Sequence, residues 1–225
     1  MSENINTQTS LIKPTYFEIF NRVLNELNRR EIKSFEEIEK EEDKRILNHI
    51  NATNAEVLSS YVWNFQIEKT SVELQKDCAT IMNNFEGKII CVCEGSKKYK
   101  YVHPALINSL SQKRADVYSN IGPLLLTNPI KQIRKLDIYY VSSQYALNSS
   151  NQRIPKMSAK DDTSTIPMPH VEPILVYGTL IRVKANPNFA KFSFWRAMYY
   201  NSINILRSAG NLSCEDYPHI KLGIN

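Results

Sequence analysis

Glycine is scarce in this sequence, with 6 among 225 residues, and there are 4 histidines. The chain has no P-loop, GxGxxG, HExxH, GxSxG or EF-hand pattern. Glycine-rich loops let a backbone cradle phosphate groups, so a nucleotide site of that kind is excluded. The histidines stand singly, with no nucleophile or carboxylate at a telling spacing. We therefore expect no enzyme, no catalytic residues and no cofactor.

Long apolar runs are also missing. No stretch approaches the ~20 residues needed to cross a bilayer, and the opening MSENINTQTS lacks the apolar core of a signal peptide. We therefore expect no contact with a membrane. The 28 Lys and Arg against 23 Asp and Glu give a net charge of +5, which permits contact with nucleic acid without arguing for it. At 42% hydrophobic residues, the composition is that of a globular protein.

Two of the four cysteines are close in sequence. Cys91 and Cys93 lie in KIICVCE, a strand-like run in which residues i and i+2 point to the same face. With His103 nearby they could form half of a zinc site, but a second pair of ligands at the required spacing is missing. Plain buried thiols in a reducing compartment are the favoured interpretation, and we expect no metal site.

The first part of the chain has the pattern of two helices. Thr15 and Glu18 form a capping box ahead of a helix of about four turns, whose apolar face is Phe17, Phe20, Val23, Leu24 and Leu27. A charged link then leads to a second helix. Its apolar stripe consists of Ile46, Ile50, Val57, Leu58 and Tyr61. The acidic run 36–43 lies at or before its N-terminus, where negative charge is favourable.

A proline-bounded helix follows in the stretch IPMPHVEPILVYGTLIRVKANPN. Its first prolines lack a backbone donor, so they lie before the helix or in its first turn. We expect the helix at 170–185, with apolar side chains on two stripes and therefore on most of its circumference. Such a helix is buried on most sides and lies at the centre of a helical core. The core residues that we expect are Trp63, Tyr177, Leu180 and Trp195.

A fourth helix is expected at 189–209, and it carries two apolar stripes. Phe192, Trp195, Tyr199, Ile203 and Leu206 form the first stripe. Phe194, Met198 and Ile205 form the second, roughly 100–120° away around the helix. A single bundle core needs only one of them. The second is covered either by the strand region of the chain or by a neighbouring subunit, because large exposed apolar patches are unusual on monomers.

Between the helices the hydrophobic period changes from 3.6 to 2. Strands are expected at 61–74, 88–93, 98–103, 115–119 and 135–142. Residues 144–165 are rich in Ser, Asn, Lys and Asp, and we interpret them as a long loop. The expected fold is mainly α with some β, that is, a four-helix bundle with a strand-containing insertion between helices 2 and 3 and extended terminal arms.

This interpretation divides the chain into four parts. Residues 1–14 are an N-terminal arm, 15–61 with 166–210 are the helical bundle, 62–165 are the β-rich insertion and long loop, and 211–225 are a C-terminal arm. The stretch KKYKYVH interleaves bases with aromatics, as single-strand binders do, although lysines outward and tyrosines inward on a strand give the same pattern. We favour the strand interpretation. The residues alone therefore indicate an α+β protein that assembles.

Two stretches of the sequence resemble the tail tubular A proteins, a head–tail connector (adaptor) family of short-tailed bacteriophages. The first runs from NRVLNELNRR to YVWNFQIEKTSVEL, with an RILN helix and a W-x-F-N/Q-x-E-type strand entry. The matching residues are Asn21, Leu24, Leu27, Ser34, Arg45, Ile46, Leu47, Asn48, Val57, Leu58, Trp63, Phe65 and Glu68. Asn28 departs from the family, which usually has glycine there. The second stretch is the proline-bounded helix with its successor, which is similar to a helix pair shared more widely among phage adaptors.

The resemblance implies a structural virion protein. Such adaptors form rings of about twelve copies between the portal protein and the tail nozzle or tube, after assembly in the host cytoplasm. Their ring extends the channel for genomic DNA, which it contacts without sequence preference. Phe194, Met198 and Ile205 would then meet a neighbouring subunit, and a C-terminal arm carrying Tyr217, Ile220 and Leu222 would reach along the portal. The alternative is a monomeric protein that binds nucleic acid through the basic strand, Arg196 and Arg207.

Overall fold

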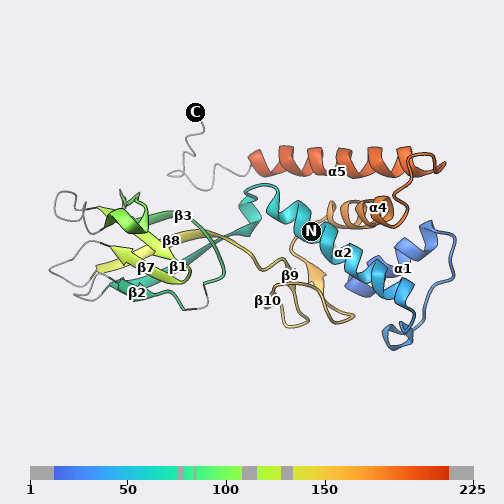
Figure 1. Cartoon of the computed structure of the whole chain (residues 1–225), viewed down its shortest axis with the longest axis horizontal. Coiled ribbons are helices and arrows are strands. Elements are labelled where there is room, and N and C mark those ends of the chain that lie inside the picture. The colour runs from blue at the N-terminus through green and yellow to red at the C-terminus, as the bar shows by residue number, and fades with distance from the viewer. Residues whose placement is uncertain (1–12, 75–78, 84, 108–115, 128–133, 213–225) are drawn as a thin grey trace, which may run out of the picture. The chain divides into compact units, whose positions relative to one another are not determined.

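The computed structural model describes residues 13–74, 79–83, 85–107, 116–127 and 134–212. The chain forms two compact units (Figure 1). The first, called here the helical unit, combines Met1–Phe65 with Tyr145–Asn225. The second, the sheet unit, is Gln66–Gln144. Strand pairing and core packing are given for each unit by itself.

The expected mainly α four-helix bundle is wrong. The described residues form a mixed α+β fold with three β-sheets and four α-helices, which are α1 (Tyr16–Glu26), α2 (Glu41–Ser59), α4 (Val171–Val183) and α5 (Phe192–Leu212). Two of these sheets bury a core of their own, so residues 66–144 are more than an insertion on a bundle. The helices also lack bundle packing, because α5 packs mainly on α4, whereas each helix of a four-helix bundle packs on two neighbours.

Helix α1 spans Tyr16–Glu26 and begins with the expected capping box. The Thr15 hydroxyl accepts a hydrogen bond from the amide of Glu18, and the Glu18 carboxylate accepts one from the amide of Thr15. Helix α2 spans Glu41–Ser59 and has three acidic residues in its first turn. Its buried apolar residues are Ile46, Ile50, Val57 and Leu58, while Tyr61 lies beyond its end and is exposed.

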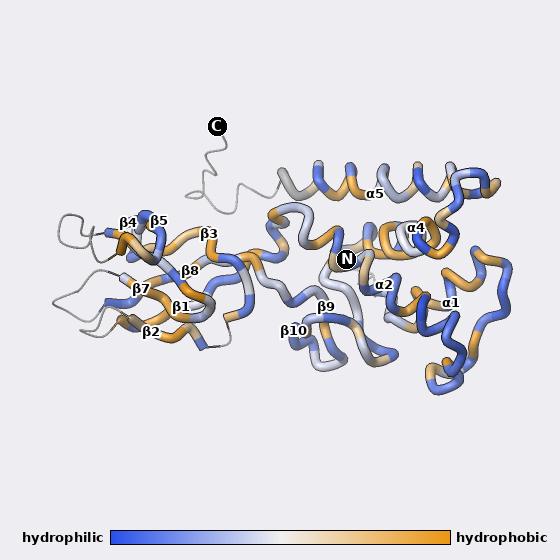
Figure 2. The backbone as a smooth tube through the Cα atoms, in the orientation of Figure 1, coloured by the Kyte–Doolittle hydropathy of each residue, from blue (hydrophilic) through white to orange (hydrophobic). Residues whose placement is uncertain are grey.

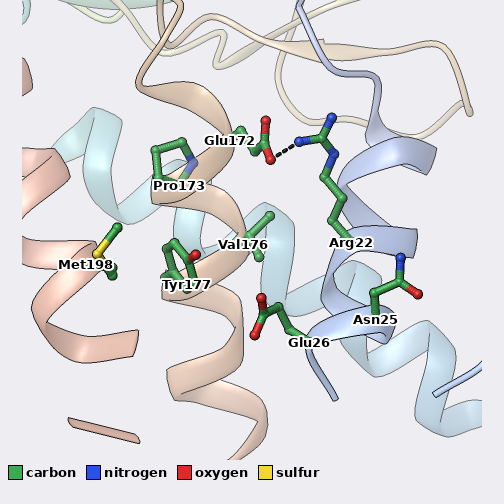
Figure 3. Close-up of a pocket in the computed structure, with 8 residues that line it drawn as sticks. All are labelled: Arg22, Asn25, Glu26, Glu172, Pro173, Val176, Tyr177 and Met198. Atoms are coloured by element: carbon green, nitrogen blue, oxygen red, sulfur yellow. Dashed lines mark ion pairs between the residues drawn. The ribbon is translucent and has the colours of Figure 1, made fainter. Parts of the chain in front are cut away.

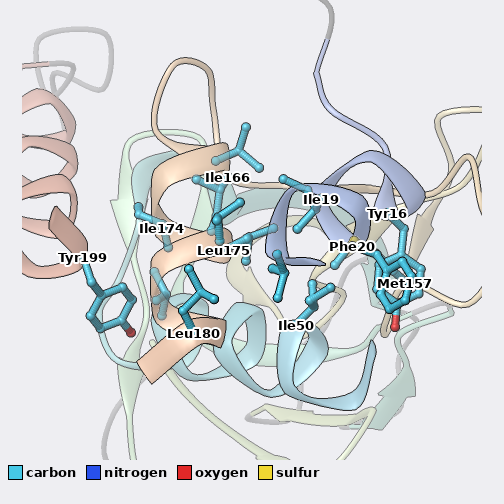
Figure 4. Packing of buried hydrophobic residues seen from close by; sticks show 14 of the residues in the cluster. Tyr16, Ile19, Phe20, Ile50, Met157, Ile166, Ile174, Leu175, Leu180 and Tyr199 are labelled. Atoms are coloured by element: carbon cyan, nitrogen blue, oxygen red, sulfur yellow. The ribbon is translucent and has the colours of Figure 1, made fainter. Parts of the chain in front are cut away.

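Helix α4, Val171–Val183, is the centre of the helical unit. It packs against α1, α2 and α5, and its buried residues lie on most of its circumference. Figure 4 shows side chains from α1, α2 and α4 converging in one core, among them Phe20, Ile50, Leu175 and Leu180. An apolar helix with little amphipathic asymmetry is stable only when other elements cover it on several sides. Helix α5, Phe192–Leu212, covers one of those sides.

In the stretch 144–165, expected as a long loop, residues 145–165 lie in the helical unit and form a small three-stranded sheet. Its strands are β9 (Ala146–Leu147), β10 (Arg153–Ile154) and β11 (Thr163–Ser164), in the order β10-β9-β11. The segment, which we call the strap, also caps α1. The amide of Tyr16 donates to the Asp162 carbonyl at 2.7 Å, and the amide of Phe17 donates to the Lys160 carbonyl at 3.2 Å. Amides of a first helical turn that have no intrahelical partner are satisfied in this way.

The sheet unit contains two four-stranded sheets. One has the order β1-β8-β3-β4, with strands Ile67–Leu74, Arg134–Ser142, Gly87–Glu94 and Lys97–Lys98. The other has the order β2-β7-β6-β5, with strands Ala79–Ile81, Leu124–Thr127, Val117–Ile121 and Lys100–Tyr101. Both sheets contribute to one core, whose buried members are Leu74, Met82, Val92, Tyr99, Tyr118, Leu125, Leu136 and Ile138.

Candidate functional site

Helix α5 of the helical unit packs one of its sides into the core. Trp195, Tyr199, Ile203 and Leu206 are all buried. The indole Nε1 of Trp195 donates to the Glu26 carboxylate at 3.4 Å, and the Phe189 ring stacks on the indole with 5.3 Å between centroids. Because this buried stripe fixes the rotation of α5 about its own axis, the direction in which its other side chains point is fixed as well.

A second apolar stripe of α5 lies roughly 100–120° around the helix from the buried one. We call it the outer face: Phe194, Met198 and Ile205. Phe194 is 53% exposed, Ile205 is 48% exposed and Met198 is partly buried. In Figure 2 the backbone of α5 alternates between hydrophilic and hydrophobic residues along its length. Spacings of four and seven residues place these three side chains on one line of the helix.

A groove of about 440 Å³ lies beside the outer face (Figure 3). Its apolar lining comes from α4 and α5, through Pro173, Val176, Tyr177 and Met198. The Tyr177 ring meets the Phe194 ring edge-on, with 5.8 Å between centroids. The apolar side of the groove is therefore continuous with the outer face.

Polar groups from α1 and α4 line the rest of this groove. Arg22 of α1 forms an ion pair with Glu172 of α4, and both side chains are partly exposed. Asn25 and Glu26 complete the lining on the α1 side. Figure 3 shows the Arg22–Glu172 pair spanning the two helices above the apolar residues. An apolar centre with a polar rim is the arrangement found at protein–protein contacts.

A second groove, of about 340 Å³, lies between α2, α4 and α5. Arg182 pairs with Glu56 across it, and the Arg196 guanidinium lies over the Tyr200 ring at 5.8 Å. Burial, followed by the charge of Arg182, lowers the pKa of the nearby His49. This groove also has an apolar lining, which includes Ile181, Pro187 and Phe192, and its Arg182 and Glu56 charges are paired with each other.

Close approach of helices explains why glycine is used at position 178. A Cβ at Gly178 would lie 2.5 Å from the Thr53 methyl and 2.7 Å from the Tyr199 ring. Any side chain here would push α4 away from α2 or α5. Gly178 therefore sets the position of α5, and with it the position of the outer face.

Candidate metal ligands do not gather in the described part of the chain. No set of three or more His, Cys, Asp or Glu residues there could hold a metal ion. Asp162 is buried, but its carboxylate accepts hydrogen bonds from the amides of Ser158 and Ala159, at 2.6 and 2.8 Å. These hydrogen bonds to the Asp162 carboxylate hold the local backbone of the strap in place.

The basic strand proposed for nucleic acid is partly used within the sheet unit. Lys97 pairs with Asp116 at 2.5 Å, and the Tyr99 side chain is buried in the sheet core. Tyr101 is exposed, with its ring edge-on to Tyr118 at 5.6 Å. Lys98 and Lys100 are exposed. The single strand expected at 98–103 is therefore wrong, because β4 and β5 are short strands of two different sheets. The lysines of the stretch are exposed and Tyr99 alone of its two tyrosines is buried.

The residues singled out from the sequence fall into three groups. Trp63, Leu180 and Trp195 are buried and Tyr177 is partly buried, all in the core of the helical unit. Phe194, Met198 and Ile205 form the outer face of α5. Tyr217, Ile220 and Leu222 lie outside the described residues. Sequence reasoning missed Arg22 and Glu172, because a pair between two distant helices leaves no local pattern.

Comparison of the chain with protein-family models gives no match, and a search of curated proteins finds no significant relative. None of the helices among the described residues is both long enough and apolar enough to cross a membrane.

Proposed function

We propose that this protein is a head-to-tail adaptor of a short-tailed bacteriophage. Copies of the chain would form a ring that joins the portal protein to the tail nozzle or tube. The ring would be part of the channel through which DNA leaves the virion. Support comes from two family-like motifs in the expected order, one running from Asn21 to Glu68 and one at the proline-bounded helix.

The observation that carries the proposal is the exposed outer face of α5. Phe194 and Ile205 are each about half exposed, although the helix already buries another full apolar stripe. Exposed apolar surface of this kind is unusual on a monomer and typical of a contact with another protein. The occupant that we assign is a neighbouring copy of the chain.

A ring also constrains the form of this contact. Cyclic assemblies of many copies use heterologous contacts, in which one surface meets a different surface on the next copy. Each subunit would therefore use its outer face to contact a different surface of the next subunit. The Arg22–Glu172 ion pair would belong to the polar rim of this contact. DNA inside the ring would be held by backbone electrostatics alone, so no base-specific contact is expected.

The test is co-sedimentation with the portal protein encoded in the same genome. Wild-type protein is expected to sediment with portal rings, with several copies bound to each ring. The double variant Phe194→Ser/Ile205→Ser should remain folded, because both side chains are exposed, but should lose this assembly. The matched control Ser193→Ala/Asn204→Ala changes two other exposed positions of α5 and should behave like the wild type.

Two results would contradict the proposal. The first is assembly of the double variant at wild-type level, which would remove the outer face from the contact. The second is a protein that stays monomeric with portal and binds single-stranded DNA regardless of sequence, which would favour the nucleic-acid alternative. In that case charge-reversing Arg196 and Arg207 should weaken DNA binding and reduce its salt dependence.

A further inference from the structure

Two cysteines of the sheet unit lie side by side on strand β3. The Sγ atoms of Cys91 and Cys93 are 3.1 Å apart, and both are free thiols. A disulfide bond is about 2.05 Å long, so the two sulfurs need to approach by roughly 1 Å. Residues i and i+2 of an extended strand are about 6.6 Å apart at Cα, which lies within the usual disulfide range. The sulfurs are therefore close enough to bond after a local adjustment of the strand, because a disulfide also needs its two Cβ atoms within about 4.5 Å of each other.

The surroundings make the two thiols unequal. Cys91 is buried, whereas Cys93 is partly exposed near the end of β3. A register irregularity between Ile89 and Cys91 interrupts the pairing of β3 with β8 just before the pair. Bulged strands bend locally, which gives this segment more freedom than a regular ladder has. Cys93 is thus the thiol that an external reagent reaches first.

We propose that Cys91 and Cys93 form a vicinal dithiol that closes to an intramolecular disulfide by exchange with a low-molecular-weight disulfide. The Cys93 thiolate attacks one sulfur of that disulfide, forms a mixed disulfide and releases one small thiolate. The Cys91 thiolate then attacks Sγ of Cys93 and expels the second small thiolate. Each cysteine sulfur is oxidised by one electron, the small disulfide is reduced, and the two protons leave on the two released thiols.

The charges near the pair affect the rate of this exchange. Burial first, then the contact with Cys91, raises the pKa of Cys93 to about 11, and the nearby Asp137 acts in the same direction. Lys98 acts in the opposite direction. The thiolate is the attacking species, so exchange is expected to be slow at neutral pH and faster at mildly alkaline pH. Only Val92 lies between the two cysteines, so the closed ring constrains little of the unfolded chain and should change stability little.

The experiment uses the full chain with Cys78→Ser and Cys214→Ser, so that only the pair remains. After incubation with oxidised glutathione at mildly alkaline pH, intact-mass spectrometry should show the loss of two hydrogens and no glutathione adduct. The free-thiol titre should fall from two per chain to none. Adding Cys91→Ser should instead trap a stable glutathione adduct on Cys93, whereas Cys93→Ser should stay largely unmodified.

A second probe covers the case in which a serine at the buried position disturbs folding. Phenylarsine oxide binds tightly only where it bridges two neighbouring sulfurs, so the two-cysteine chain should bind it and Cys91→Val or Cys93→Ser should not. Circular dichroism checks that each chain is folded. A folded two-cysteine chain that keeps both thiols free, holds a stable glutathione adduct or forms disulfide-linked dimers would overturn the proposal.

Discussion

The Asn51 side chain and the Met157 backbone hold each other by two reciprocal hydrogen bonds. Asn51 Nδ2 donates to the Met157 carbonyl at 2.9 Å, and the Met157 amide donates to Asn51 Oδ1 at 3.1 Å. Asn51 lies in α2 and Met157 lies in the strap, 106 residues later. Asn54, one turn further along α2, donates to the Tyr145 carbonyl at 2.9 Å. The strap is thus attached to α2 by hydrogen bonds from the side-chain amides of Asn51 and Asn54.

Replacing Asn51 with Leu should therefore destabilise the protein. The change leaves the Met157 amide and carbonyl without their partner in a partly buried place, at a cost of roughly 2–3 kcal/mol. Urea unfolding of the two proteins measures this difference directly. Asn204→Leu, an exposed position of α5, is the matched control and should change the free energy of unfolding by less than about 0.5 kcal/mol. Equal effects of the two variants would show that the strap contact contributes nothing specific.

Truncation of Trp63 should strongly destabilise the helical unit. It is 1% exposed, its Nε1 donates to the Val57 carbonyl at 2.8 Å, and its ring stacks on Phe65 at 5.7 Å. Trp63→Ala removes this packing and leaves a cavity, so the expected loss is about 3–5 kcal/mol. Thermal unfolding followed by circular dichroism provides the measurement. A melting temperature equal to that of the wild type would contradict the buried placement.

Stability should fall in alkaline solution, partly through Tyr199. Burial, and then the charge of Glu56, raises the pKa of this phenol to about 12, above its ordinary value of about 10. Between these values the unfolded chain loses the proton while the folded chain keeps it, so unfolding becomes more favourable as pH rises. Below about pH 10 the contribution is constant.

The Tyr199→Phe variant should therefore show a shallower decline of the urea midpoint between about pH 10 and pH 12 than the wild type. Tyr200→Phe is the control, because Tyr200 is next to Tyr199 in the chain but its ring is exposed. The wild type and Tyr199→Phe declining in parallel would mean that the Tyr199 phenol ionises equally in both states.

The helices could be predicted from the sequence because their signals are local. The Thr15–Glu18 capping box and the apolar stripe with Ile46 and Ile50 each fall within one helix, where periodicity follows directly from backbone geometry. The outer face of α5 could be predicted for the same reason, since Phe194, Met198 and Ile205 are spaced by whole turns.

The fold class could not be predicted, because the missing information is long-range. Strand β7, Leu124–Thr127, is too short for alternation to be read, and it forms a sheet only through pairing with β2 and β6. The strap is mostly polar, and its few apolar residues, such as Ile154 and Met157, follow no regular period, so hydrophobic periodicity offers no signal there. Its order comes from partners such as Asn51 and Asn54 in a helix far away in the sequence.

The C-terminal segment should separate function from stability. Helix α5 runs to Leu212, so removal of residues 213–225 leaves every described element intact. If the segment is a portal-binding arm, the truncated chain should keep its melting temperature and lose co-sedimentation with portal. Serine at Tyr217, Ile220 and Leu222 should reproduce that loss, since each buried aliphatic or aromatic contact is worth about 1.5–3 kcal/mol and acts in every copy of the ring. Full portal binding by the truncated chain would instead place the contact on the helical unit.

Electron microscopy of the purified protein mixed with portal rings from the same genome tests the adaptor proposal most directly. The proposal predicts an additional ring of density stacked on one end of each portal, present with the wild type and absent with Phe194→Ser/Ile205→Ser. Portal rings without extra density, at micromolar wild-type protein that is folded by circular dichroism, would contradict it.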